Sequence, residues 1–495
     1  MSLFPMNRGQ ARARLVQAGA PLLAAALVAG CGSAYRPVIS PINPTGPAAQ
    51  PTSLAAVISS PSANSNGIAT IINYSGDTVM ATAPVGPNPS AFSLDSTGST
   101  GYTVNSDGTV TNFQISSSLQ EKDLQFTTLP STSRLIGLFS PSSGMWAADL
   151  DGDIADIFSG YPETFKLAIP VAPTPVAVVG PSSGQRNYVI SQVGDANGTD
   201  CNNSPTTAPN GMATGIEIAS YSADTPIQLG KCPVYAVESS DSKRLFVLNR
   251  GSDTITVINA QNNTLDECTP FVNQNGQTVT CHPSLPLSTT AGLAQDANND
   301  VPAVAGPVYA EYDAVTSQLV VADYDGGTVS VIDVSLDEFG NDSPTFGTTF
   351  TIPVGKSSTK PYPASVTVLS DSSRAYTANQ GDSTVAVVNL ASHKVEKWLG
   401  VVGHPRTVVS TSNSLYGKVY VASPDSPYLT IIRTDQDIVD TTLLIQGNVV
   451  DVRVSTQDAT RGNSNATSRV PGYGQPCNLP PTGTPVTLAA CQAMH

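Results

Sequence analysis

Hydrophobic and polar residues alternate in the same way along four stretches of the chain. In each stretch a short run with apolar residues at every second position is followed by a turn of Gly, Asp, Ser or Asn, and then by a second alternating run. A period of two is the pattern of a half-buried strand, so each stretch predicts a β-hairpin. The four stretches are residues 244–259, 318–333, 374–389 and 418–432.

Each hairpin is flanked by two more strand-like runs. Val234–Glu238 is an example of a run before a hairpin, and Val395–Val401 is an example of a run after one. Four antiparallel strands (a, b, c and d) in about 40–50 residues are typical of a β-propeller blade. Looser copies of the same unit occupy residues 90–129, 135–171 and 176–230, so seven full units lie between residues 90 and 446.

Two fragments at the ends of this region complement each other. Residues 54–86 contain runs suited to strands b, c and d, and residues 448–455 (NVVDVRVS) suit a lone strand a. A propeller that builds one blade from both chain ends leaves no open sheet edge. We therefore expect an all-β propeller of eight blades over residues 54–456, closed by N- and C-terminal strands. A ring of seven blades is the alternative if residues 54–86 form no blade.

Composition agrees with short strands and many turns, and charge limits the partners. The 495-residue chain is 40% hydrophobic but only 12% charged, with 40 Gly and 39 Pro. Its formal net charge is -15, and residues 1–30 hold three Arg and no acid, so the chain without them carries -15 - 3 = -18. A field of this sign repels phosphate backbones, which argues against a nucleic-acid partner.

The first 30 residues have the order of an export signal: a basic start, an apolar stretch and small residues. Residues 27–31 (LVAGC) resemble the bacterial lipobox. The resemblance implies cleavage before Cys31 and attachment of lipid, including acyl chains such as palmitate, that would hold the domain to a membrane. Gly32 after the cysteine favours the outer membrane or cell surface over the inner membrane. An ordinary secreted protein with a chance cysteine is the alternative. Residues 31–53 form the lipidated end and a Pro/Ala/Ser-rich tether.

Six of the seven cysteines remain once Cys31 is set aside. They fall in pairs that are local in sequence, and export to an oxidising compartment makes three disulfides a reasonable hypothesis. Six cysteines allow 15 connectivities, so the pairing stays open. The pairs are Cys201 with Cys232, Cys268 with Cys281, and Cys477 with Cys491.

These pairs accompany the long insertions of the chain. Residues 195–213 enlarge a b–c loop, and Cys232 sits at the connector to the next blade on the same face. Residues 265–306 are the largest insertion, and residues 457–495 are a polar C-terminal tail. Long loops of a compact domain are often functional, so we expect recognition to reside there.

The hairpins resemble the YVTN family of β-propeller repeats. The matching residues are Leu245–Asn249 with Val257–Asn259, Ala375–Asn379 with Val387–Asn389, and Val329–Asp333. The resemblance implies an extracytoplasmic propeller. It leaves the activity open, because members range from surface-layer proteins and binding scaffolds to relatives of cofactor-binding enzymes.

One group of acids has the spacing of calcium ligands. Asp149, Asp151, Asp153 and Asp156 (DLDGDIAD) alternate as carboxylates around a hard cation do. The same segment aligns with the b–c turn of other blades, where Asp and Gly are ordinary turn residues, and it lacks the later Glu of an EF-hand loop. Calcium therefore stays a weak candidate, and no other metal or cofactor is predicted. No catalytic residue is predicted.

The sequence favours a lipid-anchored, non-enzymatic propeller that binds a protein or glycan of the cell envelope. Two alternatives stay open. One is an enzyme of lactonase or dehydrogenase type with its site on the central channel, and the other is a structural component of the envelope or surface.

Overall fold

The computed structural model describes residues 54–455 apart from short internal stretches. The stretches that it does not describe are residues 63–64, 90, 96, 130–134, 140–143, 160–163, 181–184, 195–200, 202–206, 274–275, 288–304, 357–358, 412–414 and 416. Cys31, Cys477 and Cys491 also lie outside the described residues. Within the described part there is no helix of the length and hydrophobicity needed to span a membrane.

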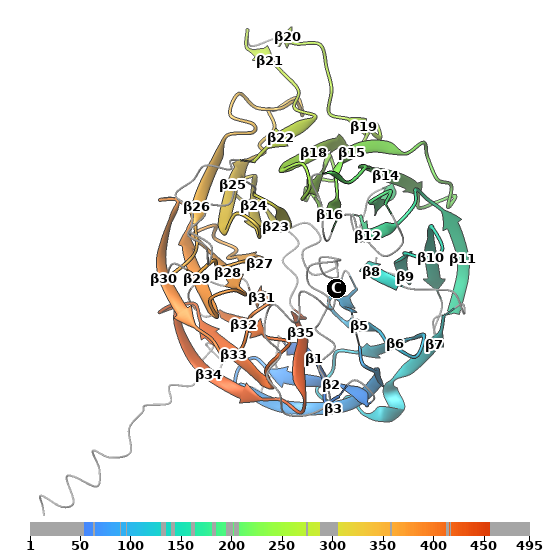
Figure 1. The fold of residues 1–495 in the computed structure, drawn as a ribbon, viewed down its shortest axis with the longest axis vertical. Coiled ribbons are helices and arrows are strands. Elements are labelled where there is room, and N and C mark those ends of the chain that lie inside the picture. Colours follow the sequence, from blue (N-terminus) through green and yellow to red (C-terminus); the bar gives the residue numbers. More distant parts are fainter. Residues whose placement is uncertain are drawn as a thin grey trace, which may run out of the picture. The chain divides into compact units, whose positions relative to one another are not determined.

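The described chain is an eight-bladed β-propeller (Figure 1), which confirms the predicted fold and blade number. Each blade is an antiparallel sheet with strand a innermost and strand d outermost. Blade 1 has β35 (Asn448–Val454), β1 (Leu54–Ser60), β2 (Asn66–Asn73) and β3 (Thr78–Pro87) as its strands a to d.

The other blades follow in chain order, and each again runs from strand a to strand d. A 3-10 turn, η1 (Glu121–Asp123), lies between the third and fourth strands of blade 2. The strands are, in blade 2, β4 (Ala91–Leu94), β5 (Thr100–Val104), β6 (Thr109–Gln114) and β7 (Gln125–Thr128); in blade 3, β8 (Leu135–Phe139), β9 (Met145–Asp149), β10 (Ile154–Ser159) and β11 (Thr164–Pro170); in blade 4, β12 (Pro175–Val179), β13 (Arg186–Ser191), β14 (Asn210–Glu217) and β15 (Ile227–Lys231); in blade 5, β16 (Pro233–Glu238), β17 (Arg244–Asn249), β18 (Thr254–Asn259) and the split pair β19 (Thr264–Leu265) and β22 (Ser284–Pro286); in blade 6, β23 (Pro307–Asp313), β24 (Gln318–Asp323), β25 (Thr328–Asp333) and β26 (Thr349–Pro353); in blade 7, β27 (Pro363–Val368), β28 (Arg374–Asn379), β29 (Thr384–Asn389) and β30 (Lys394–Gly400); and in blade 8, β31 (Thr407–Ser410), β32 (Lys418–Ala422), β33 (Tyr428–Arg433) and β34 (Ile438–Leu444).

Strand β35 closes the ring by pairing antiparallel with β1. The register runs from Ala55 opposite Val454 to Ser60 opposite Asn448, with one irregularity after Ile58. Innermost strands of neighbouring blades contact one another around the full circle. Closure in this way leaves every innermost strand with a paired neighbour in its own blade and a packed neighbour on each side, as expected from the terminal fragments.

Buried Val, Ile, Leu, Ala and aromatic side chains fill the spaces between blades. The largest apolar cluster spans blades 5 to 7 and includes Phe246, which stacks on Tyr312 at a ring-centroid distance of 6.4 Å. Strands b and c are buried along most of their length because both faces pack on neighbouring blades. The alternation seen in the sequence therefore separates two apolar interfaces rather than an apolar face from a solvent face.

A cation begins strand b in four of the described blades, and it reaches a c–d turn of the following blade. These contacts join neighbouring blades on one face of the ring. The contacts are Arg186 Nη1 to the Gln261 carbonyl (3.4 Å), Arg244 Nη2 to Asp342 Oδ1 (3.3 Å), Arg374 Nη1 to Asp437 Oδ2 (2.5 Å) and Lys418 Nζ to Asp77 Oδ2 (2.6 Å).

Candidate functional site

The largest insertion interrupts the outermost strand of blade 5. Strand β18 pairs first with β19, where Asn259 lies opposite Thr264, and then with β22, where Ile255 lies opposite Leu285. Residues 266–283 thus leave the sheet and return to it, whereas the sequence analysis treated residues 265–306 as one insertion. The boundary was wrong because Leu285 completes strand d and is buried in the core between blades.

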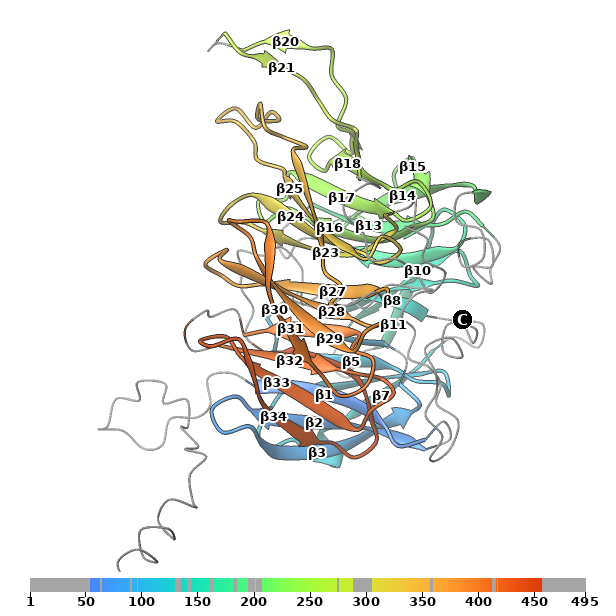
Figure 2. The ribbon, with the colours of Figure 1, turned by 60° about the vertical axis from the view of Figure 1, so that its left-hand side comes forward.

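The excursion ends in a small hairpin that stands beyond the rim of the ring (Figures 1 and 2). Its strands are β20 (Phe271–Val272) and β21 (Thr278–Val279), which pair with each other as a separate two-stranded sheet. Phe271 is 43% exposed and Val272 is 66% exposed. A two-stranded hairpin is at best marginally stable alone, so its order has to come from the attachment at its base.

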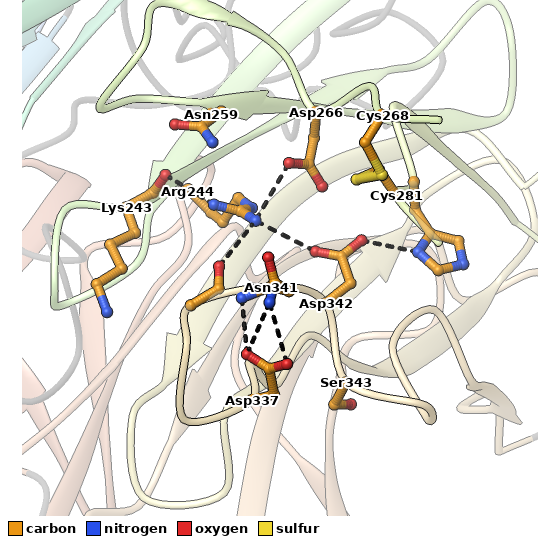
Figure 3. Close-up of polar contacts among 12 residues, drawn as sticks. Lys243, Arg244, Asn259, Asp266, Cys268, Cys281, Asp337, Asn341, Asp342 and Ser343 are labelled. Carbon is orange, nitrogen blue, oxygen red and sulfur yellow. Dashed lines mark hydrogen bonds and ion pairs between the residues drawn. A yellow bond between two sulfur atoms is a disulfide. The ribbon is translucent and has the colours of Figure 1, made fainter. Parts of the chain in front are cut away.

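Two acids meet a single buried arginine at that base (Figure 3). Arg244 Nη2 lies 3.1 Å from Asp266 Oδ1 and 3.3 Å from Asp342 Oδ1, and it also donates to the carbonyl of Gly340 at 3.3 Å. Arg244 and Asp266 are 4% and 3% exposed. The three charges come from strand b of blade 5, from the start of the insertion and from the c–d loop of blade 6. We call this group the base cluster.

Histidine completes the base cluster from the returning end of the insertion. His282 Nδ1 lies 2.8 Å from Asp342 Oδ2, and its ring stacks on Phe346 at a centroid distance of 5.2 Å. Asp342 is therefore held on both carboxylate oxygens, by Arg244 and by His282. The start of the excursion thus contacts Arg244 through Asp266, and its end contacts Asp342 through His282.

The charges in the base cluster are not balanced when both acids are ionised and His282 is neutral. Burial raises the pKa of Asp266 to about 6, with Arg244 lowering it and Asp342 raising it further. One arginine faces two carboxylates, so a proton on Asp266 would make the cluster neutral. Asp266, the first residue of the excursion, is thus a buried acid whose protonation changes the net charge of the cluster.

A disulfide closes the neck of the excursion immediately beside the cluster. Cys268 and Cys281 are bonded with a Cα–Cα distance of 5.5 Å, two residues after Asp266 and one before His282. The second disulfide joins Cys201 of the b–c loop of blade 4 to Cys232 at the connector to blade 5. Both pairings confirm the predicted connectivity for these four cysteines. The third predicted pair, Cys477 with Cys491, lies outside the described residues.

A loop of blade 6 lies against the hairpin. The Asn273 side chain hydrogen-bonds the Asp337 carboxylate, whose Oδ1 also accepts from the backbone N–H of Phe339 at 2.9 Å. Phe339 is 52% exposed. The c–d loop of blade 6 thus carries an exposed apolar side chain two residues after the acid that Asn273 of the hairpin contacts.

The four candidate calcium ligands occupy an ordinary b–c turn. Asp149 Oδ1 accepts from the backbone N–H groups of Asp151 and Gly152 at 3.2 and 3.3 Å, and Asp153 has a φ of 53° and accepts from the Thr174 N–H at 2.8 Å. Asp156 is fully buried and lies on strand c, two residues after the first residue of that strand, Ile154. Among the residues that the structure describes, no group of three or more His, Cys, Asp or Glu side chains is placed to hold a metal ion.

The same turn recurs in other blades with different residues. Asn249, Asp323 and Asn379 stand where Asp149 stands, at the end of strand b. The left-handed position of Asp153 is filled by Asp253 (φ 53°), Gly327 (φ 70°) and Ser383 (φ 55°). Asp253 likewise accepts from a connector N–H, that of Gly306, at 2.8 Å. The acidic spacing follows from turn geometry shared by the repeats.

Polar side chains on the innermost strands tie neighbouring blades together. Tyr235 and Tyr309 lie 4.7 Å apart between ring centroids, and Glu311 Oε2 accepts from the Val368 N–H at 2.7 Å. Burial raises the pKa of Tyr309 well above its usual value, Tyr235 and Glu311 add to the rise, and Arg453 from blade 1 opposes it. These four side chains are at most 8% exposed, so they lie in contacts between blades.

A second histidine–aspartate pair lies at the junction of blades 7 and 8. His404 Nδ1 is 2.5 Å from Asp425 Oδ2, and the His404 backbone N–H donates to Asp425 Oδ1 at 2.8 Å. The hydrogen bond to Asp425 raises the pKa of His404. The pair fastens a connector to a b–c turn, as Asp153 and Asp253 do elsewhere, and this favours a structural role.

Sequence reasoning missed the base cluster. Arg244 was seen only as the first residue of a strand, and Asp342 lies 98 positions away in the chain. One signal was available: Arg186, Arg374 and Lys418 begin the equivalent strands of other blades. A repeated cation at a position that the pattern otherwise buries indicates a repeated acidic partner.

The sequence matches no protein-family model and no curated protein. Solved propeller structures do align with it. The apo form of AztD from Citrobacter koseri covers 83% of this chain and 98% of its own length, with a TM-score of 0.53 and 11% identity. Dihydro-heme d1 dehydrogenase NirN, in complex with DHE, covers 83% of this chain and 77% of its own, with a TM-score of 0.52 and 13% identity. At these identities the likeness concerns the fold alone.

Proposed function

We propose that this chain is a lipid-anchored, extracytoplasmic β-propeller that acts as a non-enzymatic scaffold for a protein or glycan of the cell envelope. The observation that carries the proposal is the hairpin insertion of blade 5. It contributes no strand to the ring beyond β19 and β22, yet a disulfide and a buried ion cluster hold it at the rim. Structure that is costly to order and adds nothing to the core is better explained by recognition.

Export is supported by two independent features. Residues 27–31 resemble a lipobox, and the four described cysteines that follow form two disulfides, which persist in oxidising compartments and are rare in the cytosol. Lipid on Cys31 would hold the propeller at the membrane, with residues 31–53 as the spacer. The likeness to AztD and to the dehydrogenase NirN supports a propeller scaffold, and at 11% and 13% identity it brings no activity to this chain.

Lipid anchoring is tested with Cys31→Ser in the native cell. We expect the unaltered chain to partition into detergent and to carry a lipid-sized mass increment on its N-terminal peptide, and the variant to lose both. A variant that stays in the membrane fraction, or an unaltered chain with an unmodified N-terminus, would contradict the anchor.

The scaffold role is tested by cross-linking the tagged chain in the native cell, followed by mass spectrometry of captured proteins and glycans. One or two reproducible envelope partners are expected. An unaltered chain that purifies alone under these conditions would argue against a scaffold and favour the alternative of an enzyme of lactonase or dehydrogenase type.

A further inference from the structure

We propose that the blade 5 hairpin and the adjoining loop of blade 6 form a docking surface for an extended, basic segment of a protein partner, which adds as a strand to the hairpin. We call this the rim surface. This proposal rests on the proposed scaffold function and specifies where on the propeller the partner binds and what chemistry the partner has. Its residues are Glu267, Phe271, Val272, Glu338 and Phe339.

Position, rather than exposure, distinguishes these residues from other surface apolar side chains. Phe271, Val272 and Phe339 are 43%, 66% and 52% exposed. Among the other exposed apolar residues, Val79 and Met80 lie on β3, the outermost strand of blade 1, and Val315, Val402 and Leu415 lie in turns or connectors of the ring. The hairpin is different, because within the described chain β20 and β21 pair only with each other and leave two short outer edges.

Free strand edges favour strand addition as the mode of binding. Main-chain hydrogen bonds to an edge supply affinity with little dependence on sequence, and the side chains beside the edge supply selectivity. Phe271 and Val272 are adjacent on β20, so they project to opposite faces of the hairpin. An added strand with alternating side chains would meet an apolar residue on each face.

The rim surface is held in place before any partner arrives. The Cys268–Cys281 disulfide closes its neck, Arg244 binds Asp266 on one side of the neck, and the Asn273 side chain joins the hairpin to Asp337 of the neighbouring loop. Binding to a preorganised surface costs less conformational entropy than binding to a loose loop. This is the physical benefit of fastening so small a hairpin at three points.

Charge selects a basic partner over the alternatives. Residues 266–283 and 334–348 contain five acids and no Lys or Arg. Arg244 lies beneath and is bound by two of these acids, and Lys243, whose Nζ lies near Gly340 of the loop, is paired with Asp241 at 3.5 Å. Glu267 and Glu338 are exposed. The sign attracts a Lys- or Arg-bearing strand. The negative charge of the rim surface repels a second copy of this chain, whose net charge is -15. It contributes no electrostatic attraction to a neutral glycan.

The test uses the full processed chain and two labelled peptides, one alternating Lys with Val and one alternating Glu with Val. We expect the Lys–Val peptide to bind more tightly by about tenfold or more, with an affinity that falls as salt is added. Binding should slow amide hydrogen exchange in the peptides that cover residues 271–279.

Paired variants assign the effect to the rim surface. Phe271→Ser with Val272→Ser should weaken the Lys–Val peptide by about tenfold, because two apolar contacts are lost. Val79→Ser with Met80→Ser is the matched control, since it removes another adjacent, exposed apolar pair, and it should leave affinity unchanged. Equal binding of both peptides, equal loss in both variants, competition by a neutral oligosaccharide, or self-association lost only in the Phe271/Val272 variant would each overturn the proposal.

Cross-linking in the cell separates this proposal from the function on which it rests. Loss of the captured envelope partner with Phe271→Ser and Val272→Ser supports the rim surface. Capture of the same partner at the same yield by that variant would overturn the surface and leave the scaffold function standing. A partner missing even for the unaltered chain would contradict the function itself.

Discussion

A buried lysine joins the last blade to the first, and its replacement tests how much this contact stabilises the ring. Lys418 at the start of β32 is 1% exposed, and its Nζ lies 2.6 Å from Asp77 Oδ2 and 2.7 Å from the Tyr74 carbonyl oxygen. Lys418 belongs to blade 8, whereas Asp77 and Tyr74 form the c–d turn of blade 1. The contact joins residues 341 positions apart. Lys418→Met keeps most of the side-chain volume and removes the charge.

The expected penalty follows from the acid left behind. Removing one partner of a buried ion pair costs about 3–5 kcal/mol, because the remaining charge is uncompensated. For a propeller of about 400 residues, an unfolding entropy of about 2.1 cal/mol/K per residue converts this into a fall in Tm of about 4–6 °C. The double variant with Asp77→Asn removes both charges and should recover much of the loss, so the two substitutions should be strongly non-additive.

Thermal unfolding followed by circular dichroism measures both effects, and its pH dependence adds a check. Burial raises the pKa of Asp77, with Lys418 lowering it in the native chain. In Lys418→Met the pKa rises further, and a raised folded pKa means stability that is present at low pH and lost as pH rises. The Lys418→Met penalty should therefore be larger at about pH 8 than at about pH 5. A Tm within about 1 °C of the unaltered chain, or additive single and double variants, would refute the reasoning.

Three further predictions concern the insertion and the turns. Burial raises the pKa of Asp266 to about 6, so its contribution to the unfolding free energy is present below about pH 4 and is lost as pH rises through about 6. Asp266→Asn should therefore flatten the curve of stability against pH between about pH 4 and about pH 6. An unchanged curve would contradict the assignment. Cys268→Ser with Cys281→Ser opens a loop whose ends are 13 positions apart, for which loop-closure entropy gives about 3 kcal/mol, so the Tm should fall by about 3–4 °C. Amide exchange should also speed up in residues 271–279, and a much larger fall in Tm would show that the neck supports the ring. Asp149→Asn places in blade 3 the residue that Asn249 and Asn379 supply in blades 5 and 7, so it should change the free energy of unfolding by under about 1 kcal/mol. Added calcium should leave the Tm of both chains unchanged. A rise in Tm with calcium that is lost in the variant would instead support a metal site.

Blade number and ring closure were predictable because their causes are local and repeated. Each hairpin, such as residues 374–389, carries its own alternation and its own turn residues, and eight copies reinforce one another. Residues 54–86 lacked a strand a, so the lone strand of residues 448–455 was predicted to pair with them and complete that blade. The Cys268–Cys281 pair was predictable for the same reason, because its members are close in sequence and share one insertion.

The base cluster was decided by the tertiary structure. Arg244, Asp266 and Asp342 belong to three segments that meet only when blade 5 packs on blade 6 and strand d reopens after β19. Nothing in a local pattern says where a strand resumes after an excursion, because Leu285 is recognisable as part of strand d only once Ile255 lies opposite it. By itself the sequence determined the repeat, the turn chemistry and the circular order of blades, which depend on neighbours in the chain. Which charges share a buried site depended on contacts between blades, and those exist only in the closed ring.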